Sequence, residues 1–387
     1  MRILLVAGEF PPMQGGLGDF TQCLAAELVR QGCEVAVYTR RCAAGGAGPY
    51  ALLPLAREWG WADLFRLARL ASCFDVVNLQ YQAAAYRMRL PVHFLPYLCR
   101  GIRKPLVVTF HDLRVPYLFP KAGRLRQWAV RLLLTASAGV IVTNEEDKSA
   151  IDGVVPPENS SLVRIGSNIA PVQRSQARRS QLRAEWGARE VDLVISYFGF
   201  LNASKGALDL VRALALLKGG GVPAILVFIG GTVGASDPTN AAYAQNVQAE
   251  IAKLGLRGAV RFTGFQPAAE VSHSLYASDL CALPYRDGVS LRRGTFMAAL
   301  AHGLPIVTTA PAVPIPSLKH GQNVFLVPPA NPAALAEGIR TVWEDVPLRC
   351  TLAEGARKLA GEFTWPAIAT ATLRVYEAAL ARSGGRR

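Results

Sequence analysis

Hydrophobic and polar positions along the first half of the chain form short apolar runs separated by longer amphipathic stretches. The short runs have the length of strands, whereas the longer stretches repeat their apolar residues at helical spacing. Strands are predicted at 3–7, 35–39, 76–79, 106–110 and 139–143, and helices at 17–30, 62–71 and 125–134. Because the strands are apolar almost throughout, both faces of their sheet must be covered, which predicts a parallel sheet between layers of helices.

The pattern breaks at PVQRSQARRSQLRAEWGARE (171–190), which is polar, basic and turn-prone. The start of this segment is predicted to be an interdomain linker. Beyond it the alternation resumes, with strands predicted at 193–198, 224–229, 260–263, 280–284 and 305–309, and helices at 207–217, 241–254, 292–302, 332–343 and 366–382. The sequence therefore predicts two doubly wound α/β domains. Ligands of such sheets bind at the carboxyl ends of strands, so the loops after the strands are where chemistry is expected.

Charge narrows the choice of partners. Of 387 residues, 51% are hydrophobic and 18% charged, with 42 Lys and Arg against 28 Asp and Glu, which gives a net charge of +14. This balance favours anionic partners such as nucleotides, phosphorylated substrates, nucleic acid or acidic membrane. Nucleic acid explains the charge but none of the motifs, since aromatic residues are only 8% of the chain and form no stacking array.

The cysteines and histidines bear on compartment and metal binding. The seven cysteines are scattered without a C-x-x-C pair, and the five histidines show no metal-ligand spacing. Neither a disulfide framework nor a zinc site is expected, and a reducing compartment is favoured. The first apolar run is too short for a signal peptide, and no run reaches the roughly 18 residues of a membrane span. We expect a cytosolic protein.

Two loops of the first half carry candidate binding residues. In GEFPPMQGGLGDF, Gly15 and Gly16 let the backbone approach a ligand closely, and the helix that follows points free N–H groups at the loop. This favours contact with a phosphate or an acceptor, although a turn without a ligand has the same composition. In VVTFHDLR, His111 could donate to a substrate hydroxyl or phosphate, while Asp112 could orient it or bind a sugar. Alternatively, His111 is structural and Asp112 caps the next element.

Two glycine-containing loops of the second half suggest a nucleotide. ISYFGFLNASKGALDLV ends a predicted strand at Gly199 and begins a helix near Lys205. A lysine at a helix start is unfavourable, because the helix dipole is positive there, unless an anion neutralises it. A diphosphate would do so; the alternative is an exposed lysine on an ordinary loop. FIGGTVG, which contains Gly230, suits either close approach of a nucleotide or an unliganded turn.

The segment PYRDGVSLRRGTFMAALAHGLPIVTT places two arginines at the start of a predicted helix, 292–302. Arg292 and Arg293 oppose the helix dipole unless they share one anion with the backbone N–H groups; otherwise both point to solvent. Ser290 or Asp287 is expected to cap this helix.

The order and spacing of PPMQGGLGDF, TFHD, FGFLNASKG and DGVSLRRGTFMAALAHGLPIVTT resemble those of the family 4 glycosyltransferases through nearly the whole chain. The resemblance implies the GT-B fold, an α/β fold in which two Rossmann-like doubly wound domains face a central cleft. It implies an acceptor-binding domain at 1–170, joined by a C-terminal helix at 365–387, and a nucleotide-sugar-binding domain at 171–364. It also implies transfer with retention at the anomeric carbon, without a metal or other cofactor.

The resemblance assigns roles to matching positions. Gly16 matches the N-terminal glycine loop, His111 the histidine near the transferred sugar, and Lys205 the lysine that holds the donor diphosphate. Catalytic roles are expected for His111, Lys205 and Arg292. Donor contacts are expected from Gly16, Gly199, Lys205, Gly230, Asp287, Ser290, Leu291, Arg292 and Arg293, and acceptor contacts from Gly15, Asp19 and Asp112.

Three positions depart from the family pattern. The arginine of the lysine motif is Phe200 here, and the family's two glutamates, eight positions apart, align with Ser290 and Ala298. We expect Arg292 or Arg293 to replace the missing arginine and Asp287 to supply a carboxylate.

These observations predict a glycosyltransferase that builds a cell-surface polysaccharide or glycolipid on a carbohydrate or lipid-linked acceptor. The missing glutamates leave two alternatives: a non-catalytic GT-B subunit that binds a partner transferase or a nucleotide, and a nucleotide-sugar epimerase. The basic stretches 121–131 and 174–183 could touch acidic lipid at the inner face of the plasma membrane, or could be solvated faces.

Overall fold

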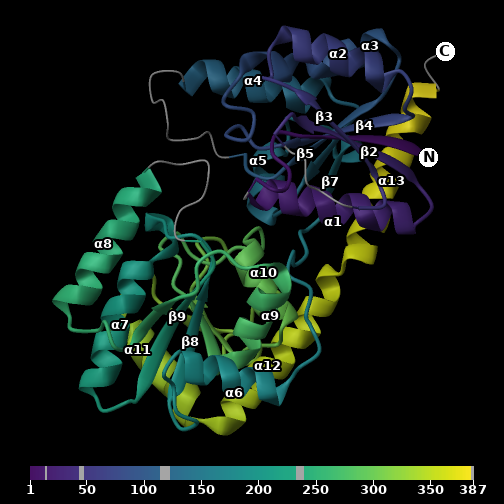
Figure 1. Cartoon of the computed structure of the whole chain (residues 1–387). Helices are drawn as coiled ribbons and strands as arrows, with labels where there is room; N and C mark the ends of the chain where they lie inside the picture. The colour runs from purple at the N-terminus through teal and green to yellow at the C-terminus, as the bar shows by residue number, and fades with distance from the viewer. Residues whose placement is uncertain (14, 43–47, 114–122, 232–238, 385–387) are drawn as a thin grey trace. The chain divides into compact units, whose positions relative to one another are not determined.

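The chain folds into two compact α/β units (Figure 1). The computed structural model describes residues 1–13, 15–42, 48–113, 123–231 and 239–384. The first unit consists of Met1–Gly166 together with Trp365–Arg387, and the second of Ser167–Thr364. The end of the chain therefore belongs to the unit that its beginning forms.

The first unit is built on a seven-stranded parallel sheet with the strand order β3-β2-β1-β4-β5-β6-β7. The strands are β1 Arg2–Ala7, β2 Glu34–Arg40, β3 Ala51–Ala56, β4 Val76–Tyr81, β5 Leu106–Phe110, β6 Gly139–Val142 and β7 Ser160–Leu162. The helices are α1 Gly16–Arg30, α2 Trp61–Ala71, α3 Leu95–Gly101, α4 Gly123–Ala136, α5 Glu145–Ile151 and α13 Trp365–Gly384, with a 3₁₀ turn, η1, at Leu90–Phe94. Figure 1 shows α2, α3 and α4 on one face of the sheet, and α1 and α13 on the other.

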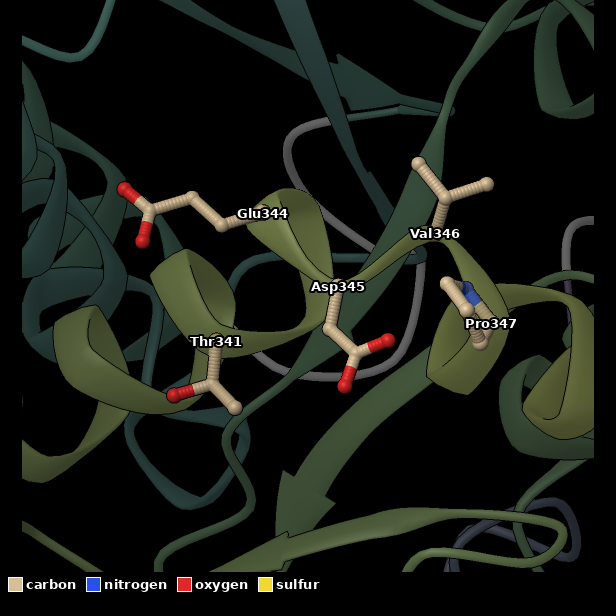
Figure 2. Close-up of a pocket in the computed structure, with 5 residues that line it drawn as sticks. All are labelled: Thr341, Glu344, Asp345, Val346 and Pro347. Atoms are coloured by element: carbon tan, nitrogen blue, oxygen red, sulfur yellow. The ribbon is translucent and has the colours of Figure 1, made fainter.

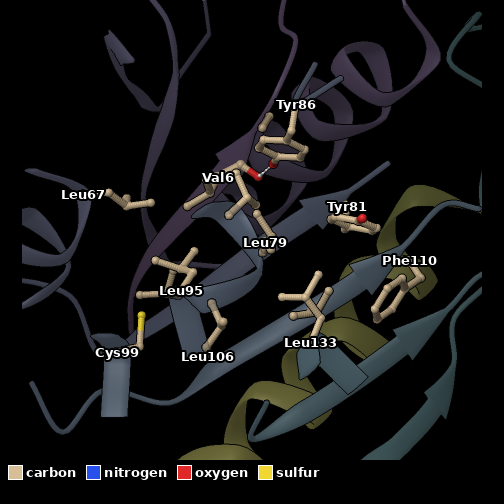
Figure 3. Packing of buried hydrophobic residues seen from close by; sticks show 14 of the residues in the cluster. Val6, Leu67, Leu79, Tyr81, Tyr86, Leu95, Cys99, Leu106, Phe110 and Leu133 are labelled. Atoms are coloured by element: carbon tan, nitrogen blue, oxygen red, sulfur yellow. Dashed lines mark hydrogen bonds between the residues drawn. The ribbon is translucent and has the colours of Figure 1, made fainter. Parts of the chain in front are cut away.

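The central strands of this sheet are buried because helices cover both of its faces. On the side of α2, α3 and α4, the core includes Leu79, Phe110 and Leu133 (Figure 3). The Tyr86 hydroxyl donates to the Val6 carbonyl oxygen at 2.9 Å, so this buried polar group is satisfied. Each such apolar side chain contributes about 1.5–3 kcal/mol through burial.

The second unit repeats the plan with a six-stranded parallel sheet in the order β10-β9-β8-β11-β12-β13. The strands are β8 Leu193–Phe198, β9 Ala224–Ile229, β10 Val260–Phe262, β11 Leu280–Leu283, β12 Ile306–Thr309 and β13 Phe325–Val327. The helices are α6 Gln176–Glu185, α7 Ala207–Gly219, α8 Thr239–Lys253, α9 Ala268–Ala277, α10 Gly294–Ala301, α11 Pro332–Glu344 and α12 Val346–Ala360, with a 3₁₀ turn, η4, at Ala203–Lys205. The prediction of two doubly wound α/β domains is confirmed.

Both sheets reverse their winding direction beside the first strand of the unit. β1 lies between β2 and β4, and β8 lies between β9 and β11. At such a switch point, consecutive loops leave toward opposite sides and open a crevice at the carboxyl ends of the strands. The loops after β8 and β11, which carry Lys205 and Arg293, therefore flank the switch point of the second sheet.

The sequence analysis missed several peripheral elements. β7 and β13 are short edge strands, and β3 is an edge strand that contains Pro54. A proline weakens a strand pattern because it donates no ladder hydrogen bond. The unpredicted helices are α3, α5, α6, α9 and α12.

The basic segment 174–183 is exposed at 174–177 and becomes buried in the second unit at Leu182 and Arg183. It contains α6, where Arg183 is 1% exposed and donates to Asp279 at 3.0 Å. Arg179 reaches the same carboxylate at 2.7 Å, and Arg178 pairs with Glu270 at 2.6 Å. Lipid contact and a solvated face are therefore both wrong for Arg183, because its charge is neutralised inside the unit.

The other basic stretch, 121–131, lies partly outside the described residues, and its described portion is in α4. In the part of the chain that the structure describes, no helix has both the length and the apolar content needed to cross a bilayer.

Candidate functional site

The loops after β8 and β11 are tied together at their bases. Gly206, at φ +70°, packs so closely that a Cβ there would lie 2.0 Å from the Pro284 carbonyl oxygen. The Arg286 backbone N–H donates to the Ser204 carbonyl oxygen at 2.8 Å, and its guanidinium binds both carboxylate oxygens of Asp209 at 2.9 and 3.1 Å. These contacts hold the two loops in one arrangement.

Gly199 forms the floor beneath Lys205. Its φ of +118° is unfavourable for any other residue. A Cβ on Gly199 would lie 3.0 Å from Lys205 Nζ and 2.7 Å from Thr295 Cγ2. The ammonium of Lys205 and the first turn of α10 therefore both approach this glycine.

Lys205 is held in place by local contacts. Asn202 accepts from the Lys205 backbone N–H at 3.1 Å and caps the 3₁₀ turn. Nζ lies 5.8 Å from the centre of the Phe200 ring, so this ring packs beside the ammonium. Burial, and then the charge of Arg293, lower the pKa of Lys205 from 10.5 to about 8. The Lys205 ammonium and the Arg293 guanidinium thus lie close together in a partly desolvated site, as expected where an anion binds.

Arg293 is the second cation of this cluster. Its side chain is 14% exposed, forms an ion pair with Asp287, and lies 4.4 Å from the centre of the Tyr285 ring. Nε is buried and has no hydrogen-bond partner among the described residues. The Tyr285 hydroxyl meets Thr295 Oγ1 at 2.8 Å, which connects Arg293 to the start of α10. We call Gly199, Lys205, Tyr285, Arg293 and Thr295 the Lys205 cluster.

The predicted start of the helix at 292 is wrong, because α10 begins at Gly294 with Arg293 at its N-cap. Ser290 and Asp287 do not cap it. Ser290 Oγ accepts from the Arg292 backbone N–H at 3.5 Å, and Asp287 pairs with Arg293. Arg292 thus lies just before the helix, and its part in donor binding stays a prediction.

Other predicted donor residues lie around the cluster. Gly230, at φ +104°, is adjacent to Gly199, since a Cβ on it would lie 3.8 Å from the Gly199 nitrogen. Leu291 is 1% exposed and Ala298 is fully buried. The side chain at 298, which the sequence analysis aligned with a family glutamate, therefore packs inside this unit.

In the first unit, the N-terminus of α1 already holds a carboxylate. Glu9, two residues after β1, is 6% exposed and accepts from the Leu17 backbone N–H at 3.3 Å. A Cβ on Gly15 would lie 2.0 Å from Glu9 Oε1, so Gly15 makes room for this side chain. Burial raises the pKa of Glu9, while hydrogen bonds from Gly18 and Leu17 oppose the rise. The expectation that this helix points free N–H groups at a ligand is wrong for Leu17 and Gly18.

Gly16 and Asp19 differ in their surroundings. Gly16 is the first residue of α1 and is exposed, and a Cβ on it would meet nothing within 4 Å. The backbone at Gly16 is therefore open to a ligand, but the fold does not require glycine there. Asp19 lies in the first turn of α1, and burial, followed by the charge of Asp19, raises the pKa of Cys23 to about 11.

His111 ends a buried hydrogen-bond network. Its Nε2 lies 2.8 Å from Gln80 Oε1, and its ring packs edge-on against Phe20 at 4.7 Å. Gln80 donates through Nε2 to Asn78 Oδ1, which also accepts from the Tyr376 hydroxyl at 2.9 Å. Because Gln80 presents its carbonyl oxygen, His111 must carry its proton on Nε2 and present Nδ1 as an acceptor.

Burial lowers the pKa of His111 to about 4, so the imidazole is neutral near pH 7. Asp112 follows it in the loop after β5, and its predicted acceptor contact stays a prediction.

The sequence analysis missed Glu9, Gln80 and Tyr285. A signal was present for Gln80, because Asn78 and Gln80 are polar residues inside the buried strand VVNLQY. Buried polar side chains need hydrogen-bond partners within the core, so these two residues indicated a polar network at β4.

A surface hollow of about 600 Å³ lies where α11 meets α12, lined by Thr341, Glu344, Asp345, Val346 and Pro347 (Figure 2). It has no basic lining residue, and Asp345 is engaged as the cap of α12. It does not suit a diphosphate. Over the described ranges, no group of three or more Cys, His, Asp or Glu is placed to hold a metal ion.

Most of the chain matches two models of known protein families. Residues 15–166 match the family described as "Glycosyl transferase 4-like domain", and residues 178–359 match "Glycosyl transferases group 1". The D-inositol 3-phosphate glycosyltransferase of Corynebacterium efficiens is 26% identical, over 98% of this chain and 96% of the relative.

Solved structures share the fold. HepE of Anabaena in complex with UDP has a TM-score of 0.75 at 22% identity, over 97% of this chain and 99% of that one. Sucrose-phosphate synthase of Thermosynechococcus elongatus has a TM-score of 0.75 at 19% identity, over 99% of this chain and 100% of that one. At such identities the likeness shows the fold alone.

Proposed function

Because this chain belongs to the glycosyltransferases of the GT-B fold, we propose that it moves a sugar from a nucleotide diphosphate donor to a hydroxyl acceptor with retention. The donor class is supported by the UDP complex of the Anabaena protein. The proposed acceptor is a carbohydrate or a lipid-linked sugar of a cell-surface polysaccharide or glycolipid pathway. We propose a cytoplasmic enzyme that uses neither a metal nor another cofactor.

The observation that carries this proposal is the Lys205 cluster at the switch point of the second sheet. As the bond between the anomeric carbon and the diphosphate oxygen breaks, negative charge grows on that oxygen. The ammonium of Lys205, the guanidinium of Arg293 and the first N–H groups of α10 are fixed near one another and would stabilise this charge more strongly than they stabilise the ground state.

We propose that the first unit handles the acceptor and the transferred sugar. His111 presents a neutral imidazole with Nδ1 as an acceptor for a sugar hydroxyl. The attacking hydroxyl gives its proton to the departing phosphate oxygen, so no separate base is required. Gly16 offers open backbone, while Glu9 occupies part of the α1 terminus. We therefore assign the diphosphate mainly to the second unit.

The test is turnover of a panel of UDP, GDP and ADP sugars, measured as transfer or as slow hydrolysis. Lys205→Ala and Arg293→Ala are each expected to lower kcat about 10²–10³-fold, as removal of one preorganised donor does. Arg292→Ala tests the third predicted cation. The matched control is Lys218→Ala, an exposed lysine at the end of α7, which should leave turnover unchanged.

Turnover at the parent rate in both Lys205→Ala and Arg293→Ala would show that the assignment of the diphosphate is wrong. Diphosphate binding without turnover of any donor would instead support the non-catalytic alternative. Release of an isomerised free sugar would support the epimerase.

A further inference from the structure

Five aromatic side chains form a connected cluster on the outer surface of the first unit. The Phe94 ring is central, with its centre 5.3 Å from that of Trp61, 6.4 Å from Tyr97 and 6.3 Å from Trp128. Phe65 extends the cluster, 6.3 Å from Trp61. These rings come from α2, η1, α3 and α4. Figure 1 shows the three helices together on one face of the sheet, and η1 contacts all three.

Most of these rings face water. Trp61 is 48% exposed, Phe65 59%, Tyr97 44% and Trp128 46%. Contiguous exposed apolar surface of this kind marks an interaction site more often than isolated exposed residues do. We call Trp61, Phe65, Phe94, Tyr97 and Trp128 the aromatic face.

The charge around the aromatic face has a single sign. Segments 61–71, 90–104 and 123–136 contain eight cationic residues, Arg66, Arg69, Arg100, Arg103, Lys104, Arg124, Arg126 and Arg131. Their one acidic residue is Asp63, which is 4% exposed and accepts backbone N–H groups of the preceding loop. Among the cations whose side chains the structure describes, Arg69, Arg100, Arg103 and Arg131 are exposed.

We propose that the aromatic face docks on an anionic membrane surface. Tryptophan and tyrosine suit the boundary between lipid headgroups and acyl chains, because their rings are apolar and their N–H and O–H groups stay wet. On α2, Trp61, Phe65 and Arg69 recur at every fourth position, so one helix face presents two rings and a cation. Such a face lies in the headgroup layer and is attracted by anionic lipid.

Other occupants fit less well. A second copy of this face would bring the exposed arginines Arg69, Arg100, Arg103 and Arg131 close to the same set, which is repulsive. Single-stranded nucleic acid needs rings that project separately for bases to stack on, whereas these rings pack against one another through Phe94. The proposal does not depend on the transfer reaction.

The experiment is sedimentation of the full chain with vesicles of phosphatidylcholine alone or mixed equally with phosphatidylglycerol. Binding is expected with the mixed vesicles and is expected to weaken at high salt. The double variant W61S/F65S should bind about tenfold more weakly, since it removes apolar area that the membrane would bury. The double variant R69E/R131E should bind at least about thirtyfold more weakly, because each of the two cations near the surface contributes roughly 1 kcal/mol.

Matched controls come from the second unit. Phe265 is 67% exposed, and Arg257 is an exposed arginine. Phe265→Ser and Arg257→Glu should bind like the parent chain. The proposal is overturned if the parent does not bind phosphatidylglycerol vesicles, or if the face variants bind as the parent does. Two further results would overturn it, provided that vesicle binding persists in W61S/F65S. One is that these substitutions dissociate a dimer formed by the parent chain, and the other is that they abolish binding to a single-stranded oligonucleotide.

Discussion

Lys205 and His111 are both partly buried, and burial lowers the pKa of each, to about 8 and about 4 respectively. Near pH 7 the lysine is therefore still mostly protonated, whereas the imidazole is neutral. The two groups thus suit different tasks: Lys205 supplies a positive charge, and His111 supplies a hydrogen bond of fixed direction. Gln80 determines that direction, because its carbonyl oxygen requires the proton on Nε2.

The lowered pKa of Lys205 predicts pH-dependent binding of the nucleotide diphosphate. Above about pH 8 the amine of Lys205 is mostly deprotonated in the free protein, whereas a bound diphosphate favours the protonated form. Affinity for the diphosphate should therefore fall as the pH rises toward 10.5, by up to about tenfold per pH unit. Calorimetric titration with UDP and GDP at several pH values measures this. Lys205→Met should bind more weakly and lack the fall; an unchanged slope in that variant would exclude Lys205 as its source.

Gln80 is predicted to support the first unit as well as to orient His111. Gln80→Met would leave Nε2 of His111 and Oδ1 of Asn78 each short of a buried partner. The free energy of unfolding should fall by about 1–3 kcal/mol. Gln127→Met, at an exposed position on α4, should change it by less than about 0.5 kcal/mol. Urea unfolding followed by fluorescence compares them, and equal effects would contradict the network.

Among the elements, the loops after β8 and β11 are related by close backbone packing rather than by sequence proximity. Gly206 touches Pro284, and Arg286 reaches back to Ser204 and Asp209. Because α7 and α10 begin where these loops end, the same contacts set the positions of Lys205 and Arg293.

Comparing Gly206 with Gly255 distinguishes the cost of a left-handed backbone from the cost of a steric contact. Gly206 and Gly255 have nearly equal φ, +70° and +67°, but a Cβ at Gly255 would meet nothing within 4 Å. Gly255→Ala should cost about 1 kcal/mol from the left-handed backbone alone. Gly206→Ala should cost clearly more and weaken UDP or GDP binding, because its Cβ must displace β11 from the loop. Thermal unfolding and calorimetry measure both variants; equal costs would show that the contact with Pro284 is unimportant.

At the scale of the whole molecule, the chain returns to the first unit after completing the second. In α13, the Tyr376 hydroxyl donates to Asn78 in the centre of the first sheet, and Arg382 donates to the Ala138 carbonyl oxygen at 2.9 Å. Val375 packs against Gly139. The first unit therefore needs the last helix to complete its core.

Deleting 365–387 is predicted to destabilise the first unit selectively. The deletion exposes the apolar surface that α13 covers on β5 and β6 and removes a partner of Asn78. Hydrogen exchange should lose protection in β4 and β5 while β8 and β9 stay protected. A control chain that ends at Gly384 should keep the parent pattern. Loss of protection in both units together, or in neither, would contradict this division of the chain.

The sequence by itself determined the central strands of both sheets and the loops that carry Lys205, Gly199 and His111. Buried parallel strands are continuous apolar runs, and chemistry in such folds follows strand ends, so both signals are local. Edge strands and the charged helix α6 were missed because their burial is partial and their partners are distant in sequence.

Only the tertiary structure decided which charges meet. It pairs Arg293 with Asp287 beside Lys205, fills the start of α1 with Glu9, and neutralises Arg183 inside the second unit. The direction of His111 likewise depends on Gln80, from a neighbouring strand. Periodicity reports which way a side chain faces along its own element, but charge pairing and pKa depend on neighbours that folding brings from elsewhere in the chain.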